Sequence, residues 1–283
     1  MDIGLLTAPF GKEMNFAQIA EWAGKTGFKA LEVTAGPGAH MAADDVLKDD
    51  AKSVKKILKD TGVRISSLAY YRLFNVGMEA DQYVREAKEY IAAVQAIGDG
   101  NDRGGRPCLC LLAGFPAPGK NKMQTIREVM PGVYEPLVKE AEKRGVKLAF
   151  ENWFSTNLQH LGNWRALFEV LPSPNLGLNF DPSHLCWQEI DYIAAVDEFK
   201  ARIFHTHAKD TAIFRDKLSS VGVLEGGWWT YVIPGYGVVR WGEYIRQLRK
   251  CGYNGVLSIE HEDSAFNAKE GFEKGLRFLS TLA

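Results

Sequence analysis

The chain has 283 residues, of which 46% are hydrophobic and 24% charged, and its formal net charge at pH 7 is −1. This is the composition of an ordinary globular protein. The near-neutral charge argues against nucleic acid or an anionic membrane as the main partner, because phosphate binding needs a basic surface. The length would allow two domains, but α/β barrels of about 250 residues fold as one, so we expect a single domain over residues 1–283.

The N-terminal segment and the cysteines bear on location. The chain does not begin with a basic segment followed by a long apolar stretch, and no apolar run in it reaches about 18 residues, so neither a secretory signal nor a membrane span is expected. The four cysteines have neither disulfide nor zinc-finger spacing. These features predict a cytoplasmic protein with reduced cysteines.

Apolar and amphipathic segments alternate along the whole chain, and Asn15 is expected to cap the first helix. In the first half, the expected strands cover residues 2–9, 28–35, 63–71 and 107–115, and the expected helices cover 15–27, 42–61, 79–97 and 124–144. In the second half, the expected strands cover 147–151, 176–181, 203–210 and 256–260, and the expected helices cover 164–171, 191–199, 242–251 and 265–282.

The expected strands are mostly apolar rather than alternating, which is typical of a parallel sheet covered by helices. Eight strand–helix units close as a barrel, so the sequence predicts a single (β/α)8 TIM barrel of the α/β class. The alternative is an open doubly wound sheet, in which a glycine-rich phosphate turn normally follows the first strand. The first turn here lacks that pattern, since it reads Thr7-Ala8-Pro9-Phe10-Gly11-Lys12.

Four of the expected strands carry residues of the metal-binding type at or near their ends. Glu151, Asp181 and Glu260 each close an apolar run, and His207 lies near the end of the strand 203–210. Their separations of 30, 26 and 53 residues have the size of successive strand–helix units, the last lengthened by an inserted loop. The active site of a TIM barrel lies at the C-terminal ends of its strands, so we expect these four side chains to meet there.

Two further polar residues, His205 and Glu32, have other expected roles. His205 precedes His207 by two positions, so both side chains lie on one face of the strand. His205 would lie deeper in the barrel, where a structural role is favoured over metal binding. Glu32, in the second strand, could face the barrel interior near a substrate or form an ion pair.

Three carboxylates and one imidazole form a mixed oxygen and nitrogen site that suits one divalent cation. Mn²⁺ is the favoured ion, and Mg²⁺, Co²⁺, Fe²⁺ and Zn²⁺ are the alternatives. A cation with open positions can bind the carbonyl and adjacent hydroxyl oxygens of a sugar and stabilise the charge that grows when a neighbouring C–H bond is deprotonated. Glu151 and Glu260 come from separate strands and could act on opposite faces of the sugar, one removing and one returning a proton.

Four short motifs at these strand ends, in this order, resemble the sugar phosphate isomerase/epimerase family, whose members have xylose-isomerase-like barrels. The motifs read Phe150-Glu151-Asn152, Asn179-Phe180-Asp181-Pro182-Ser183-His184, His205-Thr206-His207-Ala208-Lys209-Asp210 and Leu257-Ser258-Ile259-Glu260-His261-Glu262-Asp263. The resemblance spans nearly the whole chain and implies a divalent metal bound by Glu151, Asp181, His207 and Glu260. It also implies that the two glutamates act as acid and base, and that His184 and Lys209 lie near the substrate.

Two positions differ from the ketose 3-epimerases, which are similar in the metal motifs. Those enzymes carry an arginine after the histidine ligand and a glutamate after the first glutamate ligand, where this chain has Ile213 and Asn157. Arg215 lies two residues beyond the arginine position. The motifs look more like those of the branch acting on keto-sugars and 3-keto-glycosides, in which both epimerases and lyases occur.

Three further side chains are expected to contact the substrate. Trp153 follows the first glutamate ligand and is expected to shape the pocket, and Arg215 could meet an anionic group. The segment 226–231 places several aromatic rings in the long loop before the last strand, and Trp228 is expected to stack on a pyranose ring. The alternative is that these tryptophans anchor the loop on the barrel or form a subunit contact.

The leading hypothesis is a metal-dependent sugar isomerase or epimerase, which moves a proton next to a carbonyl through a metal-stabilised enediolate. The nearest alternative is a lyase or dehydratase, in which the same intermediate expels a substituent. A DNA-repair endonuclease on a related barrel and a non-catalytic sugar-binding protein are remote alternatives. The expected partner is a small sugar, with no nucleic acid and no membrane, and a homo-oligomer is left open.

Overall fold

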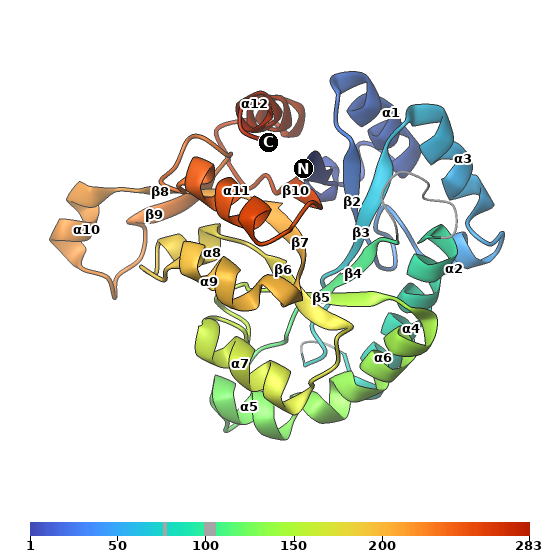
Figure 1. Cartoon of the computed structure of the whole chain (residues 1–283), viewed down its shortest axis with the longest axis horizontal. Helices are drawn as coiled ribbons and strands as arrows, with labels where there is room; N and C mark the ends of the chain where they lie inside the picture. Colours follow the sequence, from blue (N-terminus) through green and yellow to red (C-terminus); the bar gives the residue numbers. More distant parts are fainter. Residues whose placement is uncertain (76–77, 99–105) are drawn as a thin grey trace.

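A computed structural model describes residues 1–75, 78–98 and 106–283. Its centre is a closed barrel of parallel strands in the order β1-β10-β7-β6-β5-β4-β3-β2, surrounded by helices (Figure 1). The TIM barrel predicted from the sequence is therefore confirmed. None of the helices in these ranges combines the length and the apolar character that a bilayer span requires.

The barrel strands are short and all run in one direction. They are β1 (Asp2–Leu6), β2 (Ala30–Thr34), β3 (Arg64–Tyr70), β4 (Cys108–Leu111), β5 (Lys147–Glu151), β6 (Leu176–Phe180), β7 (Ile203–Ala208) and β10 (Val256–Ile259). Two further strands form a separate hairpin, β8 (Asp210–Ile213) and β9 (Trp229–Val232).

The α-helices connect successive strands, and several connections contain more than one helix. They are α1 (Phe16–Thr26), α2 (Ala43–Leu47), α3 (Lys52–Thr61), α4 (Ala80–Gly98), α5 (Lys122–Glu128), α6 (Met130–Arg144), α7 (Leu161–Val170), α8 (Ser183–Cys186), α9 (Tyr192–Phe199), α10 (Arg215–Val221), α11 (Trp241–Lys250) and α12 (Ala268–Ser280).

Two of the helices expected from the sequence are each divided in the structure. The expected helix 42–61 is interrupted between α2 and α3, where Asp50 and Ala51 have left-handed φ angles of 55° and 59° that end the helical hydrogen bonding. The expected helix 124–144 is interrupted between α5 and α6, because Pro131 has no N–H to continue the helix and lies in the first turn of α6.

The segment expected as a loop before the last barrel strand forms elements of its own. β8 and β9 pair antiparallel, and α10 lies between them. This hairpin arm, residues 210–232, projects from the barrel with α10 at its tip (Figure 1). Asp210 fixes its base, since the Asp210 carboxylate accepts hydrogen bonds from Val239 N at 2.9 Å and from Trp241 Nε1 at 2.8 Å.

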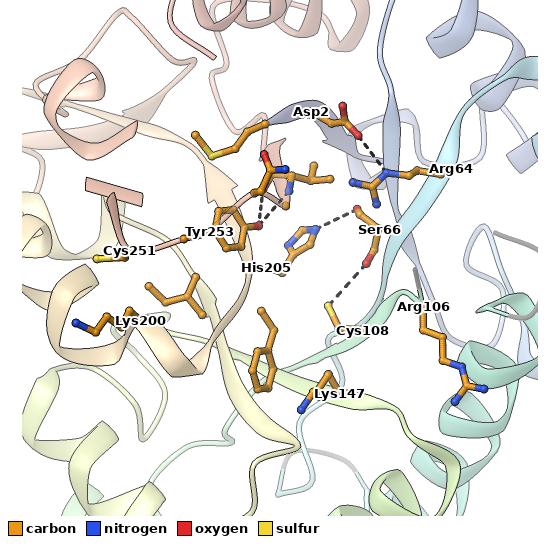
Figure 2. A pocket seen from close by; sticks show the side chains of 17 residues that line it. Asp2, Arg64, Ser66, Arg106, Cys108, Lys147, Lys200, His205, Cys251 and Tyr253 are labelled. Carbon is orange, nitrogen blue, oxygen red and sulfur yellow. Dashed lines mark hydrogen bonds and ion pairs between the residues drawn. The ribbon is translucent and has the colours of Figure 1, made fainter. Parts of the chain in front are cut away.

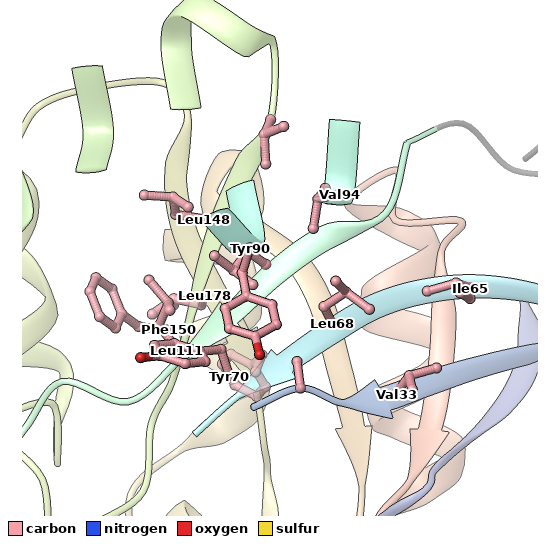
Figure 3. Close-up of a cluster of buried hydrophobic side chains, with 14 of the residues drawn as sticks. Val33, Ile65, Leu68, Tyr70, Tyr90, Val94, Leu111, Leu148, Phe150 and Leu178 are labelled. Atoms are coloured by element: carbon pink, nitrogen blue, oxygen red, sulfur yellow. The ribbon is translucent and has the colours of Figure 1, made fainter. Parts of the chain in front are cut away.

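The strands direct apolar side chains outward and small or polar ones inward. Outside the barrel, Leu148, Phe150 and Leu178 belong to one core with helix residues such as Tyr90 and Val94 (Figure 3). Hydrogen bonds across the interior link polar residues that are at most 7% exposed, namely Glu32, Ser66, Asn179, His205, His207 and Ser258. Branched apolar side chains usually fill a TIM-barrel interior, so this polar filling points to a functional role.

Candidate active site

The four predicted metal ligands meet at the C-terminal mouth of the barrel. Glu151 ends β5, Asp181 follows β6, His207 lies in β7 and Glu260 follows β10. Each offers one ligand atom, and these four atoms all lie within 4.8 Å of one another. All four side chains are buried. The structure thus brings together, from four separate strands, the residues that the sequence analysis identified.

Hydrogen bonds between neighbouring strand ends fix this geometry. Asn152 Nδ2 donates to the carbonyl of Asp181 at 2.9 Å, and Asn152 Oδ1 accepts from Asp181 N at 2.7 Å. The carboxylate oxygen Oδ1 of Asp181 accepts from Ser183 N at 2.8 Å. Because one oxygen of Asp181 is occupied in this way, its orientation is set and Oδ2 remains for another partner.

Two atoms at the centre of the cluster are orphaned. Asp181 Oδ2 and His207 Nδ1 are buried and make no hydrogen bond of acceptable geometry within the described part of the chain, although Glu260 Oε2 lies only 2.9 Å from His207 Nδ1. The two atoms are 3.7 Å apart. Buried polar atoms almost always have a partner, so converging lone pairs of this kind suit a cation. Three carboxylates and one imidazole fit a divalent ion that prefers oxygen and nitrogen ligands.

The pKa shifts in the cluster reflect the close pairing of its carboxylates with basic side chains. Burial disfavours the charged carboxylates, but Lys209 and the nearby histidines outweigh it and hold the pKa values of Asp181 and Glu260 well below their usual range. Burial also opposes charge on His207, yet Glu260 and Glu32 raise the pKa of His207 well above its usual value. The cluster therefore attracts positive charge, which a divalent cation would supply.

Glu32 lies directly behind His207. Glu32 Oε2 is 3.0 Å from His207 Nε2 and accepts from Ser258 Oγ at 2.8 Å, while Oε1 accepts from the Tyr71 hydroxyl at 2.8 Å. Burial opposes its charge, but His207 and His205 lower the pKa of Glu32 to about 2. If His207 Nε2 carries a proton and donates it in a hydrogen bond to this carboxylate, the lone pair of Nδ1 is free to bind a metal ion together with the other three ligands. Carboxylates orient metal-binding histidines in this way.

We expect Glu32→Gln to lower the affinity for a divalent metal by about 10- to 100-fold, the usual effect of losing a residue that orients a ligand. The neutral amide keeps the shape of the side chain but no longer holds the proton on His207 Nε2. Isothermal titration with Mn²⁺ measures the effect. Glu86→Gln is the matched control. Glu86 also accepts a hydrogen bond from a tyrosine, the Tyr70 hydroxyl at a distance of 3.0 Å, but it does not belong to the ligand set. Unchanged affinity in Glu32→Gln would contradict the orienting role.

His205 lies in the polar layer beneath the ligands. Its Nδ1 is 2.9 Å from Asn179 Oδ1, and its Nε2 is 3.0 Å from Ser66 Oγ. Burial lowers the pKa of His205 to about 4, so the imidazole is neutral at pH 7. Both ring nitrogens have protein partners, as expected for a structural residue.

His184 and Lys209 both contact the ligand set. His184 Nε2 is 3.1 Å from Glu151 Oε1, and its Nδ1 is 2.5 Å from the hydroxyl of Tyr231 in the hairpin arm. Lys209 Nζ donates to Glu260 Oε2 at 2.6 Å and lies 4.5 Å from the centre of the Tyr231 ring. Burial opposes the charge on Lys209, but Glu260 and the other nearby carboxylates raise its pKa well above the usual value. Lys209 is therefore an ammonium ion in this site.

Aromatic rings lie beside His184. The centroid of the Phe154 ring is 6.0 Å from that of His184, and Phe154 packs edge-on against Trp187 and Trp229 at centroid distances of 5.1 and 5.8 Å. Trp187 and Trp229 are stacked, with centroids 4.4 Å apart and an interplanar angle of 12°. We call Phe154, Trp187 and Trp229 the aromatic wall. It joins the barrel to the hairpin arm.

Of the other three residues predicted to contact the substrate, one lies near His184 and two lie elsewhere. Trp153 lies beside the aromatic wall, with its ring centroid 6.4 Å from that of Phe154. Trp228 is only 4% exposed and packs against Trp187, so it anchors the hairpin arm and presents no free face to a sugar. Arg215 is exposed at the start of α10, because the hairpin arm carries it away from the ligand set to a surface groove. The structure thus places Trp228 in the packing of the hairpin arm, which was the alternative expectation for these tryptophans, and Arg215 away from the ligand set.

A separate cavity of about 650 Å³ opens at the opposite, N-terminal mouth of the barrel (Figure 2). The first residues of several strands line it, including Asp2, Arg64 and Lys147. Two of its basic side chains have partners already, since Arg64 Nε donates to Asp2 at 3.2 Å and Lys147 Nζ donates to the carbonyl of Pro174 at 2.7 Å. Catalytic residues of TIM barrels come from the other mouth, so this cavity is distinct from the candidate active site.

Comparison with known proteins agrees with this architecture. Residues 20–282 match the family described as xylose isomerase-like TIM barrel. The chain belongs to this family. Among curated relatives of this xylose isomerase-like barrel, protein YfiH of Bacillus subtilis is 26% identical and the alignment covers 99% of this chain and 98% of YfiH. An inosose dehydratase of Clostridium beijerinckii is 24% identical, with 89% of this chain and 84% of the dehydratase covered.

Solved structures share the fold of this xylose isomerase-like barrel. The IolI protein, whose crystal structure contains a zinc atom, aligns with a TM-score of 0.75 at 19% identity, over 100% of this chain and 99% of IolI. The 3-keto-D-glucoside 4-epimerase YcjR of E. coli aligns with a TM-score of 0.73 at 16% identity, over 99% of both chains.

Proposed function

We propose that this xylose isomerase-like barrel is a divalent-metal-dependent enzyme that removes a proton from a carbon next to the carbonyl of a sugar or cyclic polyol. The observation that carries the proposal is the buried set of Glu151, Asp181, His207 and Glu260, with ligand atoms within 4.8 Å of one another and two of them orphaned. The zinc atom in the similar IolI structure supports a divalent ion, and the oxygen-rich ligand set favours Mn²⁺.

When bound, a divalent cation supplies Lewis-acid stabilisation of negative charge on a substrate oxygen. The chain itself supplies the groups that move protons. Glu151 ends β5 and Glu260 follows β10, and β6 and β7 lie between these two strands in the barrel. Two carboxylates on different sides of the mouth can serve different faces of a bound ring. This arrangement supports an isomerase or epimerase, in which one glutamate removes the proton and the other returns it.

A dehydratase is the second candidate, and the pair of His184 and Tyr231 favours it. If His184 Nδ1 accepts from the Tyr231 hydroxyl, then Nε2 carries the proton and faces Glu151 Oε1 at 3.1 Å. An N–H donor in that position can hydrogen-bond to a departing hydroxyl group, which takes up the proton that the glutamate removed from carbon and leaves as water. The similarity to inosose dehydratases supports the same candidate.

The aromatic wall supports a cyclic substrate. Trp229 is partly exposed, and its ring centroid lies 5.0 Å from that of Tyr231. Tyr231 in turn contacts His184 and Lys209. Sugar rings stack on aromatic faces of this kind. We propose that Trp229 and Trp153 contact the substrate ring and that His184 and Lys209 lie next to its reacting part.

Deuterium exchange tests the proposal and separates the two candidates. Mn²⁺-loaded protein is incubated in D₂O with a series of keto-sugars, 3-keto-glycosides and inososes, and the reaction is followed by NMR. An isomerase or epimerase is expected to place deuterium at the carbon next to the carbonyl in a product of the same composition, whereas a dehydratase is expected to form an unsaturated ketone with loss of water. Absence of both reactions and of exchange across the series, with metal bound, would contradict the proposed function.

A further inference from the structure

The candidate active site contains a lysine that is surrounded by carboxylates. Lys209 Nζ is 2.6 Å from Glu260 Oε2, 3.3 Å from Asp181 Oδ2 and 3.4 Å from Glu262 Oε1. Of these three carboxylates, Glu260 and Glu262 accept hydrogen bonds from Lys209, and Asp181 forms an ion pair with it. The Lys209 side chain is 1% exposed, which prevents water from screening these contacts. The positive charge of Lys209 is therefore balanced by carboxylates of the protein and does not form a free binding point for an anionic substrate.

Other basic side chains near this mouth of the barrel have partners outside the ligand set or lie on the surface. Arg72 follows β3 and pairs with Glu86 of α4 at 3.4 Å. Lys122 Nζ, at the start of α5, donates to the carbonyl of Phe154 at 2.6 Å. Arg215, which the sequence analysis considered as an anion partner, is exposed on the hairpin arm. Lys209 is therefore the cation that the described contacts place inside the site.

The charge balance of the site is negative. Glu151, Asp181, Glu260 and Glu262 face the single ammonium group of Lys209. With the imidazoles counted as neutral, a divalent cation in the ligand set would leave one negative charge in excess among these groups, and the ionised Glu32 behind His207 adds a second. A phosphate or carboxylate group entering this buried site would meet repulsion that is stronger than in water, because the local dielectric constant is lower.

Glu262 differs from the other three carboxylates. Its side chain is 46% exposed, and it lies outside the set of four ligand atoms. It contacts Lys209 from the solvent side, so its charge is the one that an approaching ligand meets. We propose that Glu262 determines charge specificity, so that the site takes neutral keto-sugars or cyclic keto-polyols and discriminates against phosphorylated or carboxylated ones. This inference rests on the proposed function and narrows its substrate class.

Ligand binding to Mn²⁺-loaded protein tests the inference without requiring turnover. The probes are myo-inositol, a neutral cyclic polyol, and quinate, a cyclic polyol that carries a carboxylate, both measured by isothermal titration calorimetry. We expect the unmodified protein to bind myo-inositol at least about tenfold more tightly than quinate. In Glu262→Gln, the dissociation constant for quinate is expected to fall by about tenfold while that for myo-inositol stays the same.

Glu225→Gln is the matched control, since it removes one exposed carboxylate on the hairpin arm and is expected to change neither constant. Glu262→Ala is a second variant that removes the charge without an amide. Equal binding of quinate and myo-inositol by the unmodified protein, or equal strengthening of both in the Glu262 variants, would overturn charge specificity and leave the proposed function intact. Binding of neither probe by the Mn²⁺-loaded protein would overturn this inference and contradict a polyol site altogether.

Discussion

Replacement of Glu151 or Glu260 by glutamine is expected to lower turnover by at least about 10²-fold, the lower end of the effect of losing a general base. Both carboxylates belong to the buried ligand set, and Glu151 also contacts His184 at 3.1 Å. Initial rates are measured at saturating Mn²⁺, and the metal content of the same samples is determined. Glu21→Gln, which removes an exposed carboxylate on α1, is expected to have no effect.

The two variants need not behave alike. If one glutamate removes the proton and the other returns it, the variant that lacks the second glutamate would still exchange substrate deuterium without forming product. Rates near those of the unmodified protein in both variants, with the metal fully bound, would show that the proton passes through other groups. His184 and Lys209 would then be the next residues to replace.

Loss of a metal ligand is expected to abolish the stabilisation that metal gives to the folded protein. A metal that binds only the folded state at 100 times its dissociation constant adds about 2.7 kcal/mol, which raises the melting temperature of a chain of this size by about 5 °C. Calorimetric scans with Mn²⁺ and with a chelator measure this difference. In Asp181→Asn and His207→Ala, the two scans are expected to coincide.

His205→Ala is the control for this experiment. His205 and His207 lie two residues apart on β7, but the ring nitrogens of His205 form hydrogen bonds with Asn179 and Ser66 rather than with the ligand set. We expect His205→Ala to lower the melting temperature in the chelator while keeping the upward shift with Mn²⁺. A His207→Ala protein that retains the full metal content would contradict the assignment of His207 as a ligand.

The sequence by itself determined the barrel and the membership of the central cluster. Strand and helix periodicities are local properties, so the alternation of segments was readable, as was Asn15, which forms a capping box with Gln18 at the start of α1. The grouping of Glu151, Asp181, His207 and Glu260 followed from one further fact, that parallel barrel strands end at the same mouth. The resemblance of the motifs at these ends agreed with that geometry.

Only the tertiary structure decided which residues support this cluster and which lie away from it. Glu32 and His207 are 175 positions apart in the chain, and no local pattern records that the carboxylate of one lies behind the imidazole of the other. The hairpin arm brings Tyr231 against His184 and carries Arg215 away, although both belong to one segment without clear periodicity. Such contacts depend on the register and direction of elements distant in sequence. Packing of the whole chain sets them, whereas local preference sets the elements themselves.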